Sequence, residues 1–384
     1  MPVLPLRPVG VVCLVGLIAS AGLLSCADPE TPISPVSVFS YGPETVERDR
    51  SQNIALRVAR TYGSTEAEDE GALYIPLHVD FDADGNVFVS DNGHKAIVVF
   101  SEAGEFLRRI GRPGQGPGEF TMIRGMAVAG GAVYALGGQH RLSVWSTDGT
   151  LLRDVHTPLL FRSVEAFDDA TLVVTYGSND FADTAGYESV VIAGYRDTVD
   201  GLQETNQYVT IPQLSRVSST PPVDLPDSIF ALAGDGIIYW SETREYEVTA
   251  SAESRELWRL RVAVEPERVT DEDVDDALSH ARIPVTRSSY TWPETFPVLR
   301  YMAVDGHGHL YVYPWMRRRV RNLPSVTTVP VDVFDRSGKH IFSGTIDKQP
   351  WFAGRGDLVY AIDEDEASGG RVVVAYELIE PFSP

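Results

Sequence analysis

The chain has 384 residues and a formal net charge of −22 at neutral pH, with 54 acidic side chains against 32 basic ones. This excess of negative charge argues against proteins that bind nucleic acid or anionic lipid surfaces through a basic patch. Only two cysteines are present, which excludes the small domains that several internal disulfides hold together.

The first 25 residues have the pattern of an export signal. Arg7 precedes an apolar run over residues 9–24, which is too short and too rich in glycine for a comfortable membrane span. The run ends in LLSC at residues 23–26, which resembles the lipobox of bacterial lipoproteins; the alternative is a plain secretory signal with an incidental cysteine. The resemblance implies a lipoprotein signal peptide over residues 1–25 and a lipid on Cys26. It also implies anchoring in the bacterial cell envelope, in the outer membrane or facing the periplasm.

The segment that follows the signal differs in composition from the rest of the chain. Residues 26–53 are rich in Pro, Ser and charged residues and show weak periodicity. This composition is typical of a linker. We therefore predict a flexible tether over residues 26–53 and a globular domain over residues 54–384.

One pattern repeats through the globular part. Its clearest copies are HVDFDADGNVFVSD from His78, RGMAVAGGAVYALG from Arg124 and YMAVDGHGHLYVYP from Tyr301. Each copy has an alternating apolar strand, a Gly/Asp turn and a second strand rich in Val, Tyr or Phe, which predicts a β-hairpin. A third strand follows, and weaker copies bring the total to six. Repeats of about 40–50 residues with four strands each are typical of a β-propeller.

The first copy also resembles a known family of repeats. DADGNVFVSDNGHKAIVVFSEAGEFLRRIGRPGQGPGEF resembles an NHL-type repeat from six-bladed propellers. The resemblance implies an all-β fold, a six-bladed β-propeller of four-stranded antiparallel blades, and it specifies a fold rather than an activity. The stretch IALRVARTYG, which starts at Ile54, resembles the outer strand FLRRIG. We expect it to pair with the last blade and close the ring, because a closed ring has no exposed edge there.

The stretch GRPGQGPGEF at residues 111–120 raises the question of a phosphate-binding loop. Such a loop needs Gly-Lys-Ser/Thr followed by a helix. Here Gly118 precedes Glu119, whose charge repels phosphate, and a strand follows. We therefore interpret the stretch as a crossing between two blades.

Two further patterns resemble metal sites. Acidic residues from Asp80 to Asp91 have nearly the spacing of a calcium loop, but VFV at residues 87–89 favours an extended strand, which predicts a hairpin instead. His307 and His309 fall in the turn of another predicted hairpin. We assign no metal site to either pattern.

The face of the propeller at which the innermost strands begin is the candidate site. In this fold the loops between the second and third strands lie at the same face, and ligands commonly bind there. The candidates at the starts of innermost strands and in these loops are His78, Arg124, Arg162, Asp227, Arg300, His94 and His140.

These candidates predict a basic mouth of the channel in an acidic protein. A basic funnel attracts anions, and Arg124, Arg162 and Arg300 would hold a carboxylate or phosphate through paired hydrogen bonds. A buried cluster of like charges needs compensation, which Asp227 or the anion would supply. The alternative is that these arginines bond only to carbonyls and acids of neighbouring loops.

The sequence favours a binding or scaffolding module over an enzyme. Its partners would be the membrane, through the lipid anchor, and a small anionic ligand or an envelope protein, with no nucleic acid. Catalytic residues and cofactors stay unassigned. The alternative is a propeller-type enzyme with an axial metal. The candidate ligands are Asp227 in a lactonase, or His78, His94 and His140 in a metal-dependent lyase. A third reading is a structural protein without a deep pocket.

The lipobox yields a direct test. Replacement of Cys26→Ser removes the thiol that would receive the lipid, so we expect an unlipidated precursor or soluble product. Incorporation of radiolabelled fatty acid by whole cells measures this. Labelling that survives the substitution would show that the anchor lies elsewhere.

Overall fold

The structure is a computed structural model. It describes residues 36–46, 52–64, 70–138, 140–178, 187–199, 201–214, 229–234, 236–253, 255–279, 286–289, 292–316, 328–347, 354–364 and 370–379. The predicted signal peptide and Cys26 lie outside these residues. Among the helices in this part of the chain, none has the length and apolar character needed to cross a membrane.

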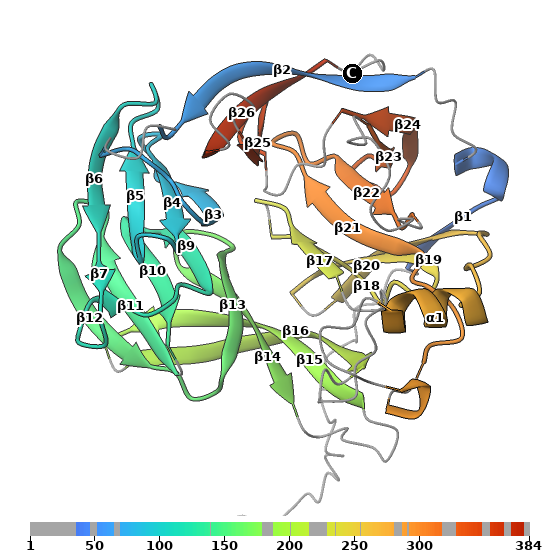
Figure 1. The fold of residues 1–384 in the computed structure, drawn as a ribbon, viewed down its shortest axis with the longest axis horizontal. Coiled ribbons are helices and arrows are strands. Elements are labelled where there is room, and N and C mark those ends of the chain that lie inside the picture. The colour runs from blue at the N-terminus through green and yellow to red at the C-terminus, as the bar shows by residue number, and fades with distance from the viewer. Residues whose placement is uncertain are drawn as a thin grey trace, which may run out of the picture. The chain divides into compact units, whose positions relative to one another are not determined.

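The strands form six mainly antiparallel blades around a common axis (Figure 1), and β2 (Asn53–Tyr62) joins blades five and six into one seven-stranded sheet. Blades one to three each have four consecutive strands. They are β3 (Pro76–Phe81), β4 (Val87–Asp91), β5 (Ala96–Phe100) and β6 (Phe106–Ile110); β9 (Gly125–Ala129), β10 (Ala132–Gly137), β11 (Arg141–Ser146) and β12 (Leu151–His156); and β13 (Phe161–Ala166), β14 (Thr171–Ser178), β15 (Tyr187–Thr198) and β16 (Gly201–Leu214).

Blades four and five repeat this order. Their strands are β17 (Ile229–Leu232), β18 (Ile238–Ser241), β19 (Tyr246–Ala252) and β20 (Arg255–Val262), then β21 (Leu299–Val304), β22 (Leu310–Pro314), β23 (Val329–Phe334) and β24 (His340–Ile346). The fold is the all-β six-bladed propeller that the repeats predict.

The last blade combines strands from both ends of the described chain. β25 (Leu358–Glu364) pairs with β26 (Arg371–Ile379), and β26 pairs on its other side with β2 (Asn53–Tyr62). The β2–β26 pairing is antiparallel and extends from Ala55, opposite Ile379, to Tyr62, opposite Val373. At its start β2 also contacts β24 of blade five, where Ile54 lies opposite Ile346.

The segment predicted as a flexible tether is in part ordered on the propeller. β1 (Ser37–Tyr41) adds to blade four as a parallel strand outside β20, and the short helix η1 (Pro43–Val46) follows it. Phe39 packs edge-on against Trp258, and the Tyr41 hydroxyl donates to the Gly338 carbonyl oxygen at 3.0 Å. The tether interpretation is therefore wrong for residues 37–46. These residues are ordered because SVFSY, residues 37–41, supplies two aromatic side chains that pack at the edge of blade four. The Pro- and Ser-rich composition of the neighbouring residues gives no sign of this packing.

The hydrophobic core lies between the blades. One cluster joins blades one and two, the next joins blades two and three, and the others continue through blades three and four, four and five, and six and one. Ile54 belongs to the cluster of blade five, while Leu56 packs against the clusters of both blade five and blade six. Each blade therefore buries both of its faces, as the near-continuous apolar strands require.

The stretch at residues 111–120 crosses from β6 of blade one to β9 of blade two, as predicted, and contains two short paired strands, β7 (Arg112–Pro113) and β8 (Glu119–Phe120). Gly118 has a φ of +67° and lies against Trp145, where a Cβ atom would meet the ring at 2.8 Å. The Glu119 carboxylate accepts a hydrogen bond from the Gly116 amide at 2.9 Å and one from Arg112. The donors of this stretch therefore bond to the carboxylate of Glu119 within the same stretch, and the stretch connects the two blades.

An insertion between blades four and five carries α1 (Asp271–Ser279). Thr270 caps it, because its hydroxyl accepts a hydrogen bond from the Asp273 amide at 3.3 Å while Asp273 bonds back to the Thr270 amide at 2.8 Å. The short helix η2 (Arg287–Ser289) follows in the same insertion.

Because β1 is ordered on blade four, we predict that two N-terminal truncations differ in their effect on stability. Removal of residues 27–50 deletes β1 and η1 and exposes the outer edge of blade four, so we expect the free energy of unfolding to fall by about 2–4 kcal/mol. Phe39→Ala alone should account for about 1–2 kcal/mol of this loss. Urea unfolding followed by tryptophan fluorescence measures both. The control is removal of residues 27–35 only, and equal midpoints for the two truncations would contradict a structural role of β1.

Candidate functional site

A cavity of about 750 Å³ lies on the axis of the propeller. Its walls come from all six blades, through β3, β9, β13, β17 and β21, and through Gly354 and β25 of the last blade. Its charged or titratable lining residues are His78, Asp80, Glu165, Tyr301, Asp363, Glu364 and Arg371.

β3 contributes two polar residues, His78 and Asp80, to the cavity wall, together with Val79. Val79 packs in the core between blades six and one. His78 and Asp80 are on the opposite side of the strand, because neighbouring side chains in a strand point to opposite faces. Both line the cavity.

Asp80 connects blade one to blade two. One carboxylate oxygen accepts a hydrogen bond from the Val128 amide on β9 at 2.7 Å, and the other accepts one from the Phe81 amide at 2.8 Å. The Val128 amide lies on the innermost strand of its blade, where no further strand can pair with it, so the carboxylate satisfies an edge donor. Burial raises the pKa of Asp80 to about 6, although the two amides and the charge of Arg355 act in the opposite direction.

Glu165 is the second acidic residue of the cavity. Its neighbour Val164 packs in the core between blades two and three, and alternation therefore places Glu165 on the other side of β13. Burial and the negative charge of Asp80 raise the pKa of Glu165 to about 7. Burial together with the charge of Glu165 also raises the pKa of Tyr301 on β21. Asp80, Glu165 and Tyr301 thus form an electrostatically coupled group that spans blades one, three and five.

His78 is held neutral at physiological pH. Burial lowers its pKa to about 4, and its Nδ1 atom lies 2.9 Å from the Ser90 hydroxyl. Of the predicted ligand-binding residues that the structure describes, His78 is the one that borders the cavity. His78 therefore offers the cavity a hydrogen-bonding group with little charge.

The predicted basic mouth is not part of this cavity, whose lining contains none of Arg124, Arg162 and Arg300. Arg124 donates instead to the Gly138 carbonyl oxygen at 2.5 Å, as the alternative reading expects. Arg162 is exposed and lies beside Gly177.

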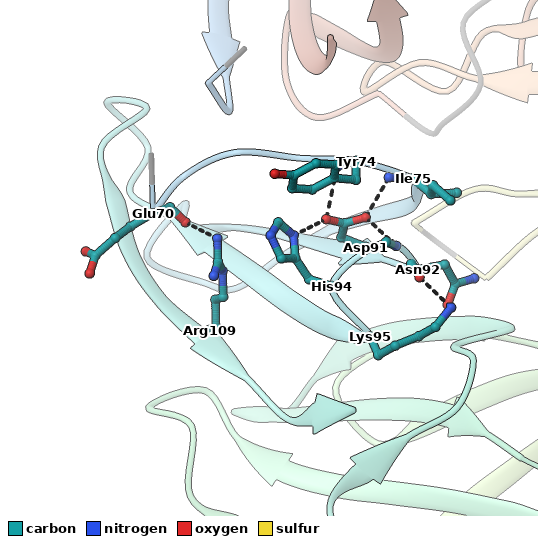
Figure 2. A network of polar contacts seen from close by, with 9 residues as sticks. Glu70, Tyr74, Ile75, Asp91, Asn92, His94, Lys95 and Arg109 are labelled. Carbon is teal, nitrogen blue, oxygen red and sulfur yellow. Dashed lines mark hydrogen bonds and ion pairs between the residues drawn. The ribbon is translucent and has the colours of Figure 1, made fainter. Parts of the chain in front are cut away.

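His94 belongs to a polar network at the end of β4 rather than to the channel (Figure 2). Its Nδ1 atom lies 2.6 Å from the fully buried carboxylate of Asp91, which also accepts hydrogen bonds from the amides of Tyr74, Ile75 and Gly93. Burial by itself would raise the pKa of Asp91, but these hydrogen bonds outweigh it and lower the pKa. The network fastens the connection before β3 to blade one, so His94 has a structural partner.

The remaining candidates are dispersed. His140, at a φ of +56°, stacks on His156 at 5.6 Å between ring centroids in blade two. Asp227 lies outside the described residues. Where the structure describes the chain, no group of three His, Cys, Asp or Glu side chains could hold a metal ion. His309, in the turn before β22, bonds to Asp305 at 2.9 Å.

Glu165 is one of several cavity residues that the sequence motifs do not predict. No motif marks it, because a single acid in SVEAF resembles an ordinary solvent-facing strand position. Asp80 drew attention only as part of a calcium-like spacing. The one usable signal was the position of each acid in the first strand of a repeat, which points toward the axis of a propeller.

Comparison with known proteins supports this fold. Residues 66–211 match the model of the family DUF5128, a 6-bladed β-propeller, and no curated protein matches the chain. The structure is similar to that of a Bacteroides fragilis protein described as exported, with a TM-score of 0.53 and 11% identity over 90% of this chain and 100% of that one. It is also similar to a member of the DUF4221 family from Bacteroides vulgatus, with a TM-score of 0.51 and 9% identity over 86% of this chain and 99% of that one. These likenesses establish the class of the protein as a six-bladed β-propeller.

The raised pKa of Glu165 predicts how stability depends on pH. Between its ordinary value of 4.5 and its folded value of about 7, the unfolded state ionises while the folded state resists ionisation, so the free energy of unfolding falls as pH rises through this window. Glu165→Gln removes the ionisation that causes this fall. We expect the difference in free energy of unfolding between the variant and the unmodified protein to be about 1–3 kcal/mol more favourable to the variant at pH 8 than at pH 4.5. Urea unfolding at pH 4.5, 6 and 8 measures the difference. The exposed Glu105→Gln serves as control, and parallel pH profiles for Glu165→Gln and the unmodified protein would contradict the assignment.

Proposed function

We propose that this protein is an exported binding module of the bacterial cell envelope whose central channel takes up a small ligand. The cavity on the axis carries the proposal. Its volume of about 750 Å³ is within the range of sites for small molecules. It combines apolar walls with a few polar groups at defined positions, which is the usual composition of such sites.

The cellular location has separate support. The first 26 residues resemble a lipoprotein signal with Cys26 as the lipid acceptor, and a protein of similar fold is described as exported. A lipid anchor suits a chain with a net charge of −22, because such a chain gains nothing from contact with anionic lipids. The partners are therefore the membrane, through the acyl chains, and a ligand that diffuses into the channel.

A glycine in the wall makes the binding function testable. Gly234 borders the cavity, and a Cβ atom at this position would have no heavy atom within 4 Å. We expect Gly234→Trp to fill part of the cavity with little strain on the backbone. Gly138 has the same open surroundings but does not line the cavity, so Gly138→Trp is the matched control.

The experiment exposes the three proteins to a small-molecule extract of the envelope and identifies retained compounds by native mass spectrometry. We expect the unmodified protein and Gly138→Trp to retain the same compound and Gly234→Trp to bind it at least tenfold more weakly. Retention of no compound by the unmodified protein, or equal retention by Gly234→Trp, would reject the channel as the binding site.

A further inference from the structure

We infer that the channel ligand carries a positive charge, such as an amine or guanidinium group, and that the Glu165 carboxylate pairs with it. This inference rests on the proposed binding function and specifies the chemical class of its ligand. The evidence comes from the hydrogen bonding of Glu165, from the charge of the cavity wall and from the aromatic residues in that wall.

Glu165 lines the cavity and has no hydrogen-bond partner among the described residues. The buried carboxylates of Asp91, Asp305 and Asp332 each accept a hydrogen bond from a neighbouring side chain. Asp80 accepts two from backbone amides. No donor in the described chain reaches Glu165, although it lines the cavity. The Glu165 side chain is half-buried, so its ionised form gains from an oppositely charged partner. The cavity leaves room for a ligand in that place.

The charge of the wall has the sign that attracts a cation. Four lining residues are acidic, namely Asp80, Glu165, Asp363 and Glu364, and one is basic, Arg371. Arg355, whose charge acts on Asp80, is already engaged with the Asp82 carbonyl oxygen at 2.7 Å and lies over the Phe81 ring. A cleft of one sign with low-dielectric walls concentrates ions of the opposite sign.

Aromatic rings in the wall favour an organic cation over a metal ion. Phe230 on β17 and Tyr301 on β21 both line the cavity, and aromatic faces attract ammonium and guanidinium groups. In the described part of the chain no three acidic, His or Cys side chains come together as metal ligands. A volume of about 750 Å³ also exceeds what a bare ion needs.

Protonation gives the inference a distinctive signature. Burial and the charge of Asp80 on β3 raise the pKa of Glu165 to about 7, so near neutral pH its carboxyl is partly protonated. The charge of Glu165 in turn acts on Tyr301 on β21. A cation beside Glu165 favours the ionised form, so its binding releases a proton to the buffer. An anion would have the opposite effect and cause proton uptake.

The test is isothermal titration calorimetry of the full chain at pH 7 with charged and uncharged probes. The cations are agmatine, spermidine and choline; 3,3-dimethylbutan-1-ol is the neutral counterpart of choline, and gluconate is the anion. We expect at least one cation to bind, at least tenfold more tightly than the neutral and anionic probes. Glu165→Gln should weaken this binding at least tenfold, whereas the exposed Glu105→Gln, which removes the same charge, should leave it unchanged. Titration in buffers of different ionisation enthalpy should show proton release that Glu165→Gln abolishes.

The outcomes separate this inference from the proposed function. Binding of gluconate or the neutral probe alone, blocked by Gly234→Trp, would overturn the positive charge and leave a binding channel. Cation binding that Glu165→Gln does not alter would overturn the role of Glu165. Circular dichroism of Glu165→Gln checks that the variant is folded, which is expected because glutamine has nearly the same shape and carries no charge.

Discussion

The packing of blade against blade is the constraint on which the rest of this structure depends. Strands such as β4, β5 and β9 are buried along their whole length, so neither face of a blade tolerates water. A sheet with two apolar faces is stable only between two other sheets. The clusters that join consecutive blades satisfy this requirement. N-terminal strands take part in it, since β2 pairs with β26 and β1 extends blade four.

The channel follows from the same constraint. Twisted sheets that converge on an axis leave their innermost edges unpaired, and these edges present backbone donors and acceptors that need partners. Asp80 meets one such need through Val128. The fold thus requires some polar side chains near the axis. Glu165 does not serve this purpose, because no donor among the described residues bonds to it. A group with an electrostatic cost and no structural partner is a candidate for function.

The distribution of charge separates two regions of the protein. Several arginines occupy connections and strand positions away from the cavity, where Arg124 bonds to a loop carbonyl. Acids dominate the described wall of the cavity. The acidic residues of the described wall have the sign of the chain's net charge of −22, which supports the cationic ligand that we propose.

The sequence by itself determined the fold class, the repeat positions and the crossing at residues 111–120. These features depend on local patterns: alternation specifies strands, Gly and Asp specify turns, and an apolar strand requires burial whatever its neighbours are. The sequence did not predict that residues 37–46 are ordered. The five residues of β1 gain their stability from an edge of blade four that lies more than 200 residues away in the chain. Most residues of the cavity wall were not predicted either, for a related reason. Which residues line the axis depends on how far each side chain extends and which core its neighbours enter, and Asp80, Glu165 and Tyr301 come together only when three blades are assembled. The tertiary structure alone decided this, since burial and coupling between charges are properties of the assembled ring and not of any segment.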